Sequence, residues 1–118
     1  MVGKGRVLVV DDEVHVLDVI ESHLVSLGYR VATAVNGESA VRLTAGESFD
    51  VALVDLKLPD CTGLALIRRF QEQAPPMRCL IMTAYATVES TIEALRLNVF
   101  DVIQKPFDLV KLGETVEA

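Results

Sequence analysis

The sequence predicts a single doubly wound α/β domain, in which helices cover both faces of a parallel β-sheet. Short apolar runs alternate with amphipathic stretches about five times along the 118 residues, as expected for repeated strand–helix units. Two runs, residues 7–10 and 51–54, are apolar at consecutive positions, which favours strands buried on both faces, as in a parallel sheet. Hydrophobic residues make up 51% of a chain long enough for one core, so we expect one domain.

The first unit runs from the strand at residues 7–10 to a second strand at residues 30–35. Between them, apolar residues recur every three or four positions over residues 13–27, which predicts a helix with one buried stripe. Gly28 follows the stripe, so we expect it to end the helix in the left-handed conformation. The second strand alternates apolar and other residues, as a half-buried strand does.

The middle of the chain repeats this arrangement. Asn36 and Gly37 are expected to form a turn before a helix over residues 38–45, which Gly46 closes. A third strand over residues 51–54 follows.

A loop rich in helix-breaking residues comes next, over residues 58–63. Thr62 is expected to cap a helix over residues 64–73, and the Pro75–Pro76 pair prevents that helix from continuing. A fourth strand is expected over residues 79–82.

The last part of the chain predicts a helix over residues 87–97, a short strand over residues 102–103 and a final helix capped by Asp108. Asn98 is expected to take the left-handed position after the first of these helices. The apolar residues expected to face the core from that helix are Val88, Ile92 and Leu95, whereas Leu97 and Val99 are left over for a possible partner surface.

Composition excludes several classes of function. The formal net charge is −6, so the chain repels phosphate backbones and is not expected to bind nucleic acid directly. No apolar run approaches the ~20 residues of a membrane span, and the N-terminus does not resemble a signal peptide. Cys61 and Cys79 are the only cysteines, which favours a reducing compartment. We therefore expect a cytoplasmic protein with no membrane partner.

Polar residues follow four of the five expected strands. Asp11 and Asp12 follow the first, Asp55 the third, Thr83 the fourth and Lys105 the fifth. Because the carboxyl ends of parallel strands lie at the same edge of a sheet, these side chains are expected to converge at that edge. Ligands of such sheets bind there.

The chemistry of that group indicates phosphoryl transfer. Three carboxylates at ~5 Å, with an effective dielectric constant of ~20, repel by roughly 3 kcal/mol per pair, so a divalent cation is expected among them. Oxygen ligands without histidine or cysteine favour Mg²⁺. A lysine and a threonine hydroxyl beside the cation suit a phosphoryl group, and one carboxylate can serve as its nucleophile.

Four motifs resemble the receiver domain of two-component response regulators. They are residues 7–13, residues 55–59 with Gly63, residues 82–84 and residues 105–107, in order and with suitable spacing over essentially the whole chain, residues 1–118. The surroundings of Thr83 and Phe100 are similar to receivers of the nitrogen-regulator type. The resemblance implies a flavodoxin-like five-stranded sheet in the order 2-1-3-4-5.

The resemblance also implies roles for individual residues. Asp55 would accept the phosphoryl group from a partner sensor histidine kinase. Asp12 and Asp55 would bind Mg²⁺ directly together with the backbone carbonyl of Lys57, and Asp11 would act on the ion through water. The chain would assist its own phosphorylation without being a turnover enzyme.

The remaining roles concern the response to phosphorylation. Lys105 would pair with the phosphoryl oxygens, and Thr83 would move in to hydrogen-bond one of them. The Lys105–Pro106 bond would be cis. The fourth helix and fifth strand would then change their packing, which would regulate an output domain or a downstream protein, and a homodimer is possible. Val102 stands where the family usually has Tyr or Phe, and Phe100 has the same strand parity.

Three other interpretations fit the same residues. The chain could be the receiver segment of a hybrid histidine kinase. It could be a Mg²⁺-dependent phosphatase of the haloacid-dehalogenase type, although that family has Asp where this chain has Glu13 and a late acid where this chain has Lys105. It could also be an interaction module that keeps the fold and is not phosphorylated. His15 and His23 are expected on the solvent face of the first helix.

Overall fold

The computed structural model describes residues 4–73, 77–84 and 87–117, so the stop expected at Pro75 and Pro76 lies outside the described residues. Five parallel strands form one sheet in the order β2-β1-β3-β4-β5 within this part of the chain. The strands are β1 (Arg6–Val10), β2 (Arg30–Ala34), β3 (Val51–Asp55), β4 (Arg78–Thr83) and β5 (Asp101–Gln104). The helices are α1 (Val14–Ser26), α2 (Gly37–Gly46), α3 (Gly63–Gln73), α4 (Val88–Arg96) and α5 (Leu109–Glu117).

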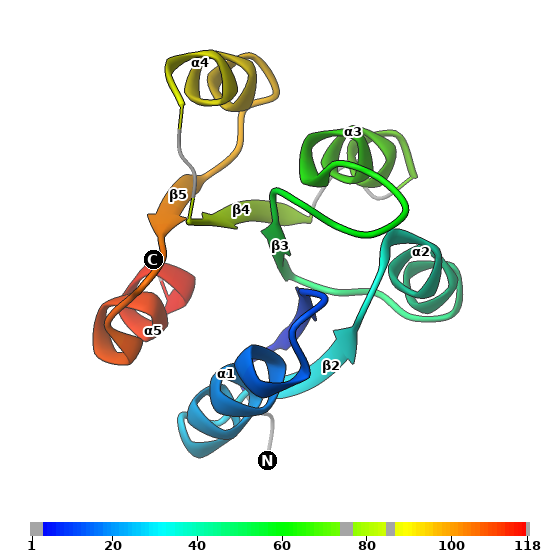
Figure 1. The fold of residues 1–118 in the computed structure, drawn as a ribbon. Coiled ribbons are helices and arrows are strands. Elements are labelled where there is room, and N and C mark those ends of the chain that lie inside the picture. Colours follow the sequence, from blue (N-terminus) through cyan, green and yellow to red (C-terminus); the bar gives the residue numbers. More distant parts are fainter. Residues whose placement is uncertain (1–3, 74–76, 85–86, 118) are drawn as a thin grey trace.

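The fold is the doubly wound arrangement that the sequence predicts. Helices α1 and α5 cover one face of the sheet, and α2, α3 and α4 cover the other (Figure 1). Each face has its own apolar core, one centred on Phe70 and Ile67 of α3 and the other on Ile20 and Leu24 of α1.

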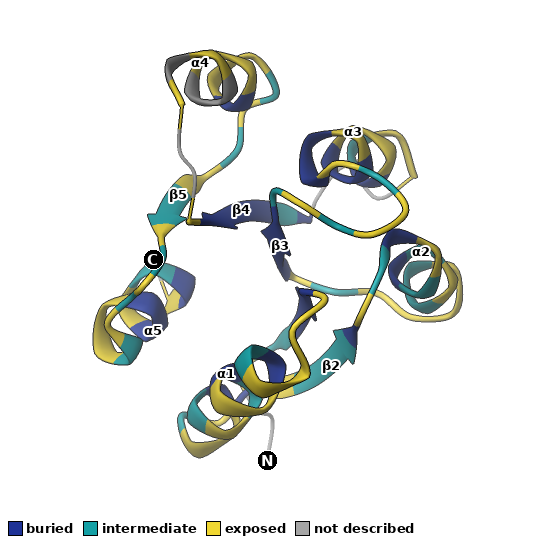
Figure 2. Ribbon diagram, in the orientation of Figure 1, coloured by how far each residue is buried: buried dark blue, intermediate teal, exposed yellow. Residues whose placement is uncertain are grey.

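The central strands supply side chains to both cores. In β1, Leu8 and Val10 pack on the α2–α3–α4 side, and Val7 and Val9 pack on the α1–α5 side. Successive residues of a strand point to opposite faces, so a strand between two helical layers has to be apolar at every position. The dark central strands of Figure 2 show this burial, which confirms the prediction from the consecutive apolar runs.

Most of the expected helix ends are confirmed. Gly28 and Asn98 have φ of 102° and 56°, the left-handed values expected after α1 and α4. The hydroxyl of Thr62 accepts a hydrogen bond from the Ala65 amide at 3.1 Å, so it caps α3 as predicted. The carboxylate of Asp108 accepts one from the Val110 amide at 2.8 Å at the start of α5.

The turn expected at Asn36 and Gly37 is wrong. Gly37 is already the first residue of α2, and Asn36 caps this helix by accepting a hydrogen bond from the Ser39 amide at 2.8 Å. Asparagine and glycine are common both in tight turns and at helix starts, so the dipeptide alone does not distinguish the two.

The apolar face expected for α4 is also wrong. Ile92 and Leu95 are 44% and 70% exposed, whereas Ala94 is buried; the side chain of Val88 lies outside the description. Leu97 and Val99, which the sequence leaves over for a partner, pack against the core instead. Among the described side chains, the helix faces the core through Ala94, and Leu97 adds to this contact just beyond the end of the helix.

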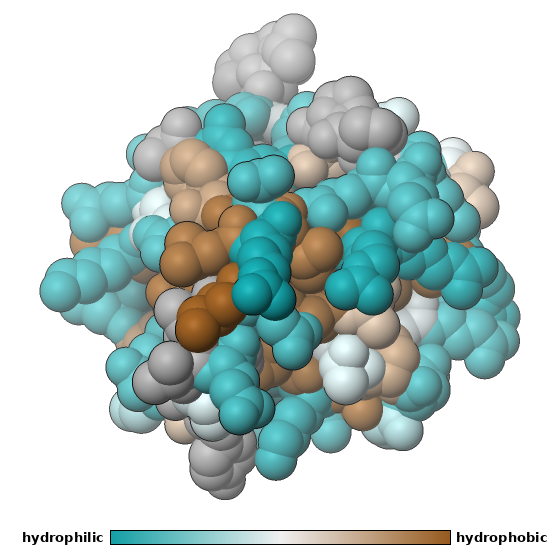
Figure 3. Space-filling model, turned by 90° about the horizontal axis from the view of Figure 1, so that it is seen from above, coloured by the Kyte–Doolittle hydropathy of each residue, from teal (hydrophilic) through white to brown (hydrophobic). Residues whose placement is uncertain are grey.

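Apolar side chains consequently reach the surface near α4. Figure 3, which views the molecule from the side of α4, shows them near the middle of this face among hydrophilic neighbours. The exposed large apolar residues of this region are Ile92, Leu95 and Phe100.

The helices of the described part are too short or too polar to cross a lipid bilayer. The longest, α1, has 13 residues.

Candidate functional site

The carboxyl edge of the sheet brings the five polar strand-end residues together. Strand β3 runs on to Asp55 and β4 to Thr83, one residue beyond the expected ends, so both side chains belong to the strands themselves. Asp11 follows β1 and Lys105 follows β5 on the same edge. A pocket of about 250 Å³ opens there, lined by Asp12, Glu13, Asp55, Lys57, Thr83, Ala84 and Lys105.

Three carboxylates form the acidic part of this site. One oxygen from each of Asp11, Asp12 and Asp55 lies within 4.8 Å of the others. Asp11 and Asp55 are buried and Asp12 is exposed, so the group opens to solvent on one side. The group contains only oxygen donors, which suit a hard cation such as Mg²⁺ better than Zn²⁺.

Lys105 reaches into the acidic group. Its Nζ lies 2.6 Å from Oδ2 of Asp11 and 3.3 Å from Oδ2 of Asp55. Burial alone would lower the pKa of the Lys105 ammonium, but the hydrogen bond to Asp11 and the charges of Asp11 and Asp55 together outweigh this effect and raise it. The three carboxylates and the one ammonium together carry a formal charge of −2, which a divalent cation would neutralise.

Asp11 is held from two sides. Its Oδ1 accepts a hydrogen bond from the Glu13 amide at 2.9 Å, while its Oδ2 binds Lys105. The side chain is fully buried. A buried carboxylate of this kind requires its partners, because an isolated charge in the interior is costly. Asp11 therefore fixes the position of the lysine ammonium beside Asp55.

Asp55 is easier to protonate in the folded chain than in water. Its pKa lies above the ordinary 3.8, first because burial disfavours the charged form and next because Asp11 repels it. The Lys57 amide, at 3.3 Å from Oδ1, and the Lys105 ammonium counteract this shift only in part. Without a cation, the ionised form of Asp55 therefore destabilises the fold.

This shift predicts how Asp55→Asn changes stability with pH. Since the folded chain binds the proton of Asp55 more tightly, stability falls as the pH rises above the ordinary 3.8, and the cost persists at neutral pH. Asparagine removes that cost. We expect the variant to melt at a higher temperature than the natural chain at neutral pH, without Mg²⁺, and the difference to shrink towards about pH 4. Scanning calorimetry measures this, and a difference that is constant with pH would contradict it.

Thr83 and Lys57 frame the opening of the pocket. Thr83 is buried at the end of β4, and its carbonyl accepts a hydrogen bond from the Lys105 amide at 2.8 Å, so the two residues are joined by their backbones. Lys57 is exposed in the loop after β3. The loop turns back so sharply that a Cβ atom on Gly63 would lie 2.3 Å from the Asp55 carbonyl oxygen. Glycine, which has no Cβ atom, avoids this clash.

Two further expectations concern β5. The Lys105–Pro106 bond is cis, as the resemblance implies. Val102, at the usual aromatic position, packs against the α2–α3–α4 core. Phe100 directly precedes β5, whereas Lys105 directly follows this strand. The Arg78 guanidinium lies 4.4 Å from the centre of the Phe100 ring. This position argues against Phe100 as a replacement for the aromatic residue.

The two histidines lie away from this site. His15 is exposed on α1, as expected. His23 is half-buried because it lies against Gly113 of α5. A Cβ atom on Gly113 would be only 3.2 Å from Nε2 of the His23 ring. The solvent-facing position expected for His23 therefore holds only in part.

Residues 7–117 match the protein family described as response regulator receiver domain. The transcriptional regulatory protein ZraR of Salmonella typhimurium is 36% identical over 98% of this chain and 26% of its own length. The DNA-binding transcriptional regulator NtrC of Escherichia coli is 32% identical over 97% of this chain and 24% of its own. Among solved structures, a CheY-like receiver domain protein from Methanospirillum hungatei superposes with a TM-score of 0.92 at 31% identity, covering 95% of this chain and 90% of that one.

The relatives confirm the nitrogen-regulator type that the sequence resembles. The chain spans about a quarter of the length of these curated relatives. The match to the family covers all five strand-end residues and both flanking cores. This chain belongs to the receiver-domain family of the response regulators of two-component systems.

Proposed function

We propose that Asp55 accepts a phosphoryl group from a partner sensor histidine kinase in a Mg²⁺-dependent step, and that the phosphorylated domain regulates an output domain or a downstream protein. The observation that carries this proposal is the placement of Asp55 in a solvent-connected pocket, with two other carboxylates within 4.8 Å and the Lys105 ammonium at 3.3 Å. A nucleophile, a candidate cation site and a fixed positive charge thus lie together in one pocket.

In the proposed reaction, a carboxylate oxygen of Asp55 attacks the phosphorus of the kinase phosphohistidine. The new O–P bond forms as the P–N bond breaks, and the electron pair of the P–N bond stays on the imidazole nitrogen, which takes up a proton. Lys105 stabilises the negative charge that spreads over the phosphoryl oxygens. The Thr83 hydroxyl donates a hydrogen bond to one of them.

Mg²⁺ fits the oxygen donors of the site. Asp12, Asp55 and the backbone carbonyl of Lys57 would hold the ion, with Asp11 acting through water. When bound, the ion would neutralise carboxylate and phosphoryl charge and so permit the approach of two anions. The chain's own residues then orient the acceptor: the Lys57 amide bonds Oδ1 of Asp55, and Lys105 bonds Oδ2.

Phosphorylation would change the surface at α4 and β5. The new group adds a charge of about −1.5 to −2, which draws Thr83 and Lys105 towards it. Thr83 ends the strand that precedes α4, and Lys105 directly follows β5. Ile92 and Leu95 of α4 are exposed. A shift between two packings there would alter the binding of an output domain, a separate partner or a second copy of the chain.

The relatives suggest what such an output would be. ZraR and NtrC are transcriptional regulators, and a receiver of that type would control transcription through another part of the protein, not by contacting DNA itself. The receiver segment of a hybrid histidine kinase remains the alternative assignment.

The proposed function is tested by incubating the chain with acetyl phosphate. We expect stoichiometric phosphoryl incorporation that requires Mg²⁺ and is released by hydroxylamine, as an acyl phosphate is. Catalytic turnover of a chromogenic phosphate ester would instead favour the phosphatase alternative, and absence of incorporation would favour the unphosphorylated interaction module.

Asp12→Ala provides a test of the metal site that does not depend on phosphorylation. Removing one of three mutually repelling carboxylates should stabilise the metal-free protein, and it should abolish the stabilisation by Mg²⁺ because a ligand is lost. For the natural chain that stabilisation is about 2.7 kcal/mol at 100 times the dissociation constant. Thermal melts with and without Mg²⁺ measure both effects, and Asp18→Ala, at an exposed acid of α1, is the control. Full protection of the Asp12 variant by Mg²⁺ would contradict the ligand assignment.

A further inference from the structure

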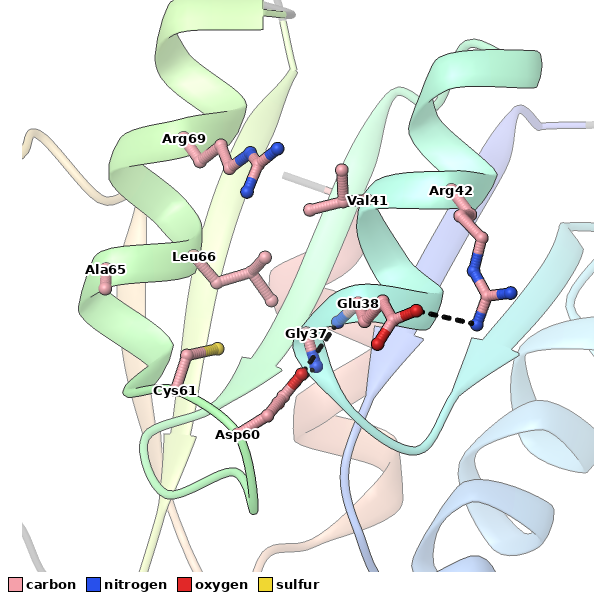
Figure 4. Close-up of a pocket in the computed structure, with 9 residues that line it drawn as sticks. All are labelled: Gly37, Glu38, Val41, Arg42, Asp60, Cys61, Ala65, Leu66 and Arg69. Atoms are coloured by element: carbon pink, nitrogen blue, oxygen red, sulfur yellow. Dashed lines mark hydrogen bonds and ion pairs between the residues drawn. The ribbon is translucent and has the colours of Figure 1, made fainter.

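The loop that follows Asp55 is fastened to the start of helix α2 by one side chain, Asp60. Its Oδ1 accepts a hydrogen bond from the Gly37 amide at 2.8 Å, and its Oδ2 accepts one from the Glu38 amide at 3.0 Å. Figure 4 shows the carboxylate of Asp60 pointing at these two amides across the mouth of a pocket of about 340 Å³ between α2 and α3. A residue of one loop thus satisfies the first two amides of a distant helix.

Helix α2 also has a cap of its own. Asn36 accepts a hydrogen bond from the Ser39 amide at 2.8 Å, so each of the first three amides of α2 has an acceptor. The two amide bonds lower the pKa of Asp60, which keeps it ionised and favourably placed at the positive end of the helix. Asp60 and Asn36 stabilise the same helix end, but only Asp60 connects it to the loop.

The loop itself is short, and its own hydrogen bonds link its tip to its base. The Leu58 amide binds the Cys61 carbonyl at 3.2 Å, Lys57 pairs with Thr62, and the Gly63 amide binds the Leu56 carbonyl at 2.8 Å. Displacing its tip would therefore displace its base, which carries the Lys57 backbone next to Asp55.

The contact between the loop and α2 is close. A Cβ atom on Gly37 would lie 2.4 Å from the Cys61 sulfur and 3.3 Å from Asp60 Oδ1. Glycine at this position therefore lets the loop lie directly on the helix start.

We infer that Asp60 is a positioning residue for the metal site: by tying the loop to α2, it holds the Lys57 carbonyl where Mg²⁺ would bind and fixes the orientation of Asp55. The inference rests on the proposed function, because it says that the hydrogen bonds of Asp60 to α2 serve the proposed Mg²⁺ site at Asp55. It also implies the reciprocal effect, since a cation that orders the loop must strengthen the bonds of Asp60 to the Gly37 and Glu38 amides.

The first test compares Asp60→Ala with Asn36→Ala. Both variants lose a cap of α2, so both should melt at a lower temperature than the natural chain. Only Asp60→Ala should weaken Mg²⁺ binding, by about tenfold, as is usual when a residue that orients a metal ligand is removed. Titration calorimetry of the metal-free chain with Mg²⁺ measures the dissociation constants. Equal affinities in the two variants would overturn the inference.

The second test compares two glycines of the same helix. Gly37→Ala places a methyl group against Cys61 and should push the loop away, whereas Gly46→Ala places one in open space, with nothing within 4 Å. We expect Mg²⁺ affinity to fall for Gly37→Ala and to stay unchanged for Gly46→Ala. This pair keeps every carboxylate in place, so a loss of affinity cannot be attributed to a lost charge.

Hydrogen exchange provides the readout at the tie itself. In the natural chain, Mg²⁺ should slow exchange of the Gly37 and Glu38 amides, and in Asp60→Ala it should not. Unchanged exchange in the natural chain, with Mg²⁺ bound, would overturn the inference while leaving the proposed function intact. If the natural chain itself fails to bind Mg²⁺, the proposed function fails and the inference falls with it.

Discussion

Asp55→Asn is expected to reduce phosphoryl incorporation from acetyl phosphate to background, a loss of roughly a thousandfold or more. The amide of asparagine is not a nucleophile towards phosphorus, whereas its shape is close to that of the carboxylate, so the pocket around it should persist. The neighbours that hold the acceptor, Lys57 and Lys105, remain in this variant. Mass spectrometry of the intact chain measures the loss directly.

A stability measurement separates loss of the acceptor from loss of the fold. The same variant should melt at least as high as the natural chain, because burial and Asp11 disfavour the charge of Asp55. Asp18→Asn, at an exposed acid of α1, should be phosphorylated as the natural chain is. Undiminished incorporation in Asp55→Asn would place the acceptor on another residue.

Lys105→Met is expected to lower the free energy of unfolding by about 3 kcal/mol, the largest stability effect at the site. Lys105 is 13% exposed and bonds Asp11, whose side chain is fully buried. Removing the ammonium leaves the Asp11 carboxylate buried with only the Glu13 amide as partner, and an uncompensated buried charge is costly. Denaturant titration at neutral pH measures the change.

A second substitution tests this explanation. Asp11→Asn in the Lys105→Met background should recover most of the lost stability, because the unpaired charge is then gone. Lys111→Met, at an exposed lysine of α5, should change stability by no more than about 0.5 kcal/mol. If the double variant were as unstable as Lys105→Met, the loss would stem from packing of the lysine side chain and not from the charge of Asp11.

The sequence predicts the site well because its residues are defined by the ends of strands. An apolar run that stops at a charged residue marks both the strand and the edge at which it ends, and parallel pairing then brings Asp11, Asp55, Thr83 and Lys105 together. The sequence does not predict which of these groups bond in the absence of a cation. That Lys105 lies closer to Asp11 than to Asp55 depends on fractions of an ångström in the packing of β1, β3 and β5.

The errors share one origin. In α4, periodicity correctly predicts a helix, but the helix is rotated so that Ala94 and not Ile92 faces the sheet. At Asn36 the residue type is right for a helix cap and for a turn, and only the partner at Ser39 distinguishes them. In each case a local pattern allows two arrangements: the sheet selects the facing of α4, and the hydrogen bond from the Ser39 amide marks Asn36 as a cap.

The sequence by itself determines the succession of strands and helices along the chain and the burial of the central strands, because these depend on periodicity within single elements. It also predicts the group of residues at the carboxyl edge, because parallel strands end at the same edge of a sheet. Only the tertiary structure decides the facing of α4, the bonds around Lys105 and the tie from Asp60 to α2. These features join segments far apart in the chain, so they depend on how finished elements pack against each other, which no local pattern of residues encodes.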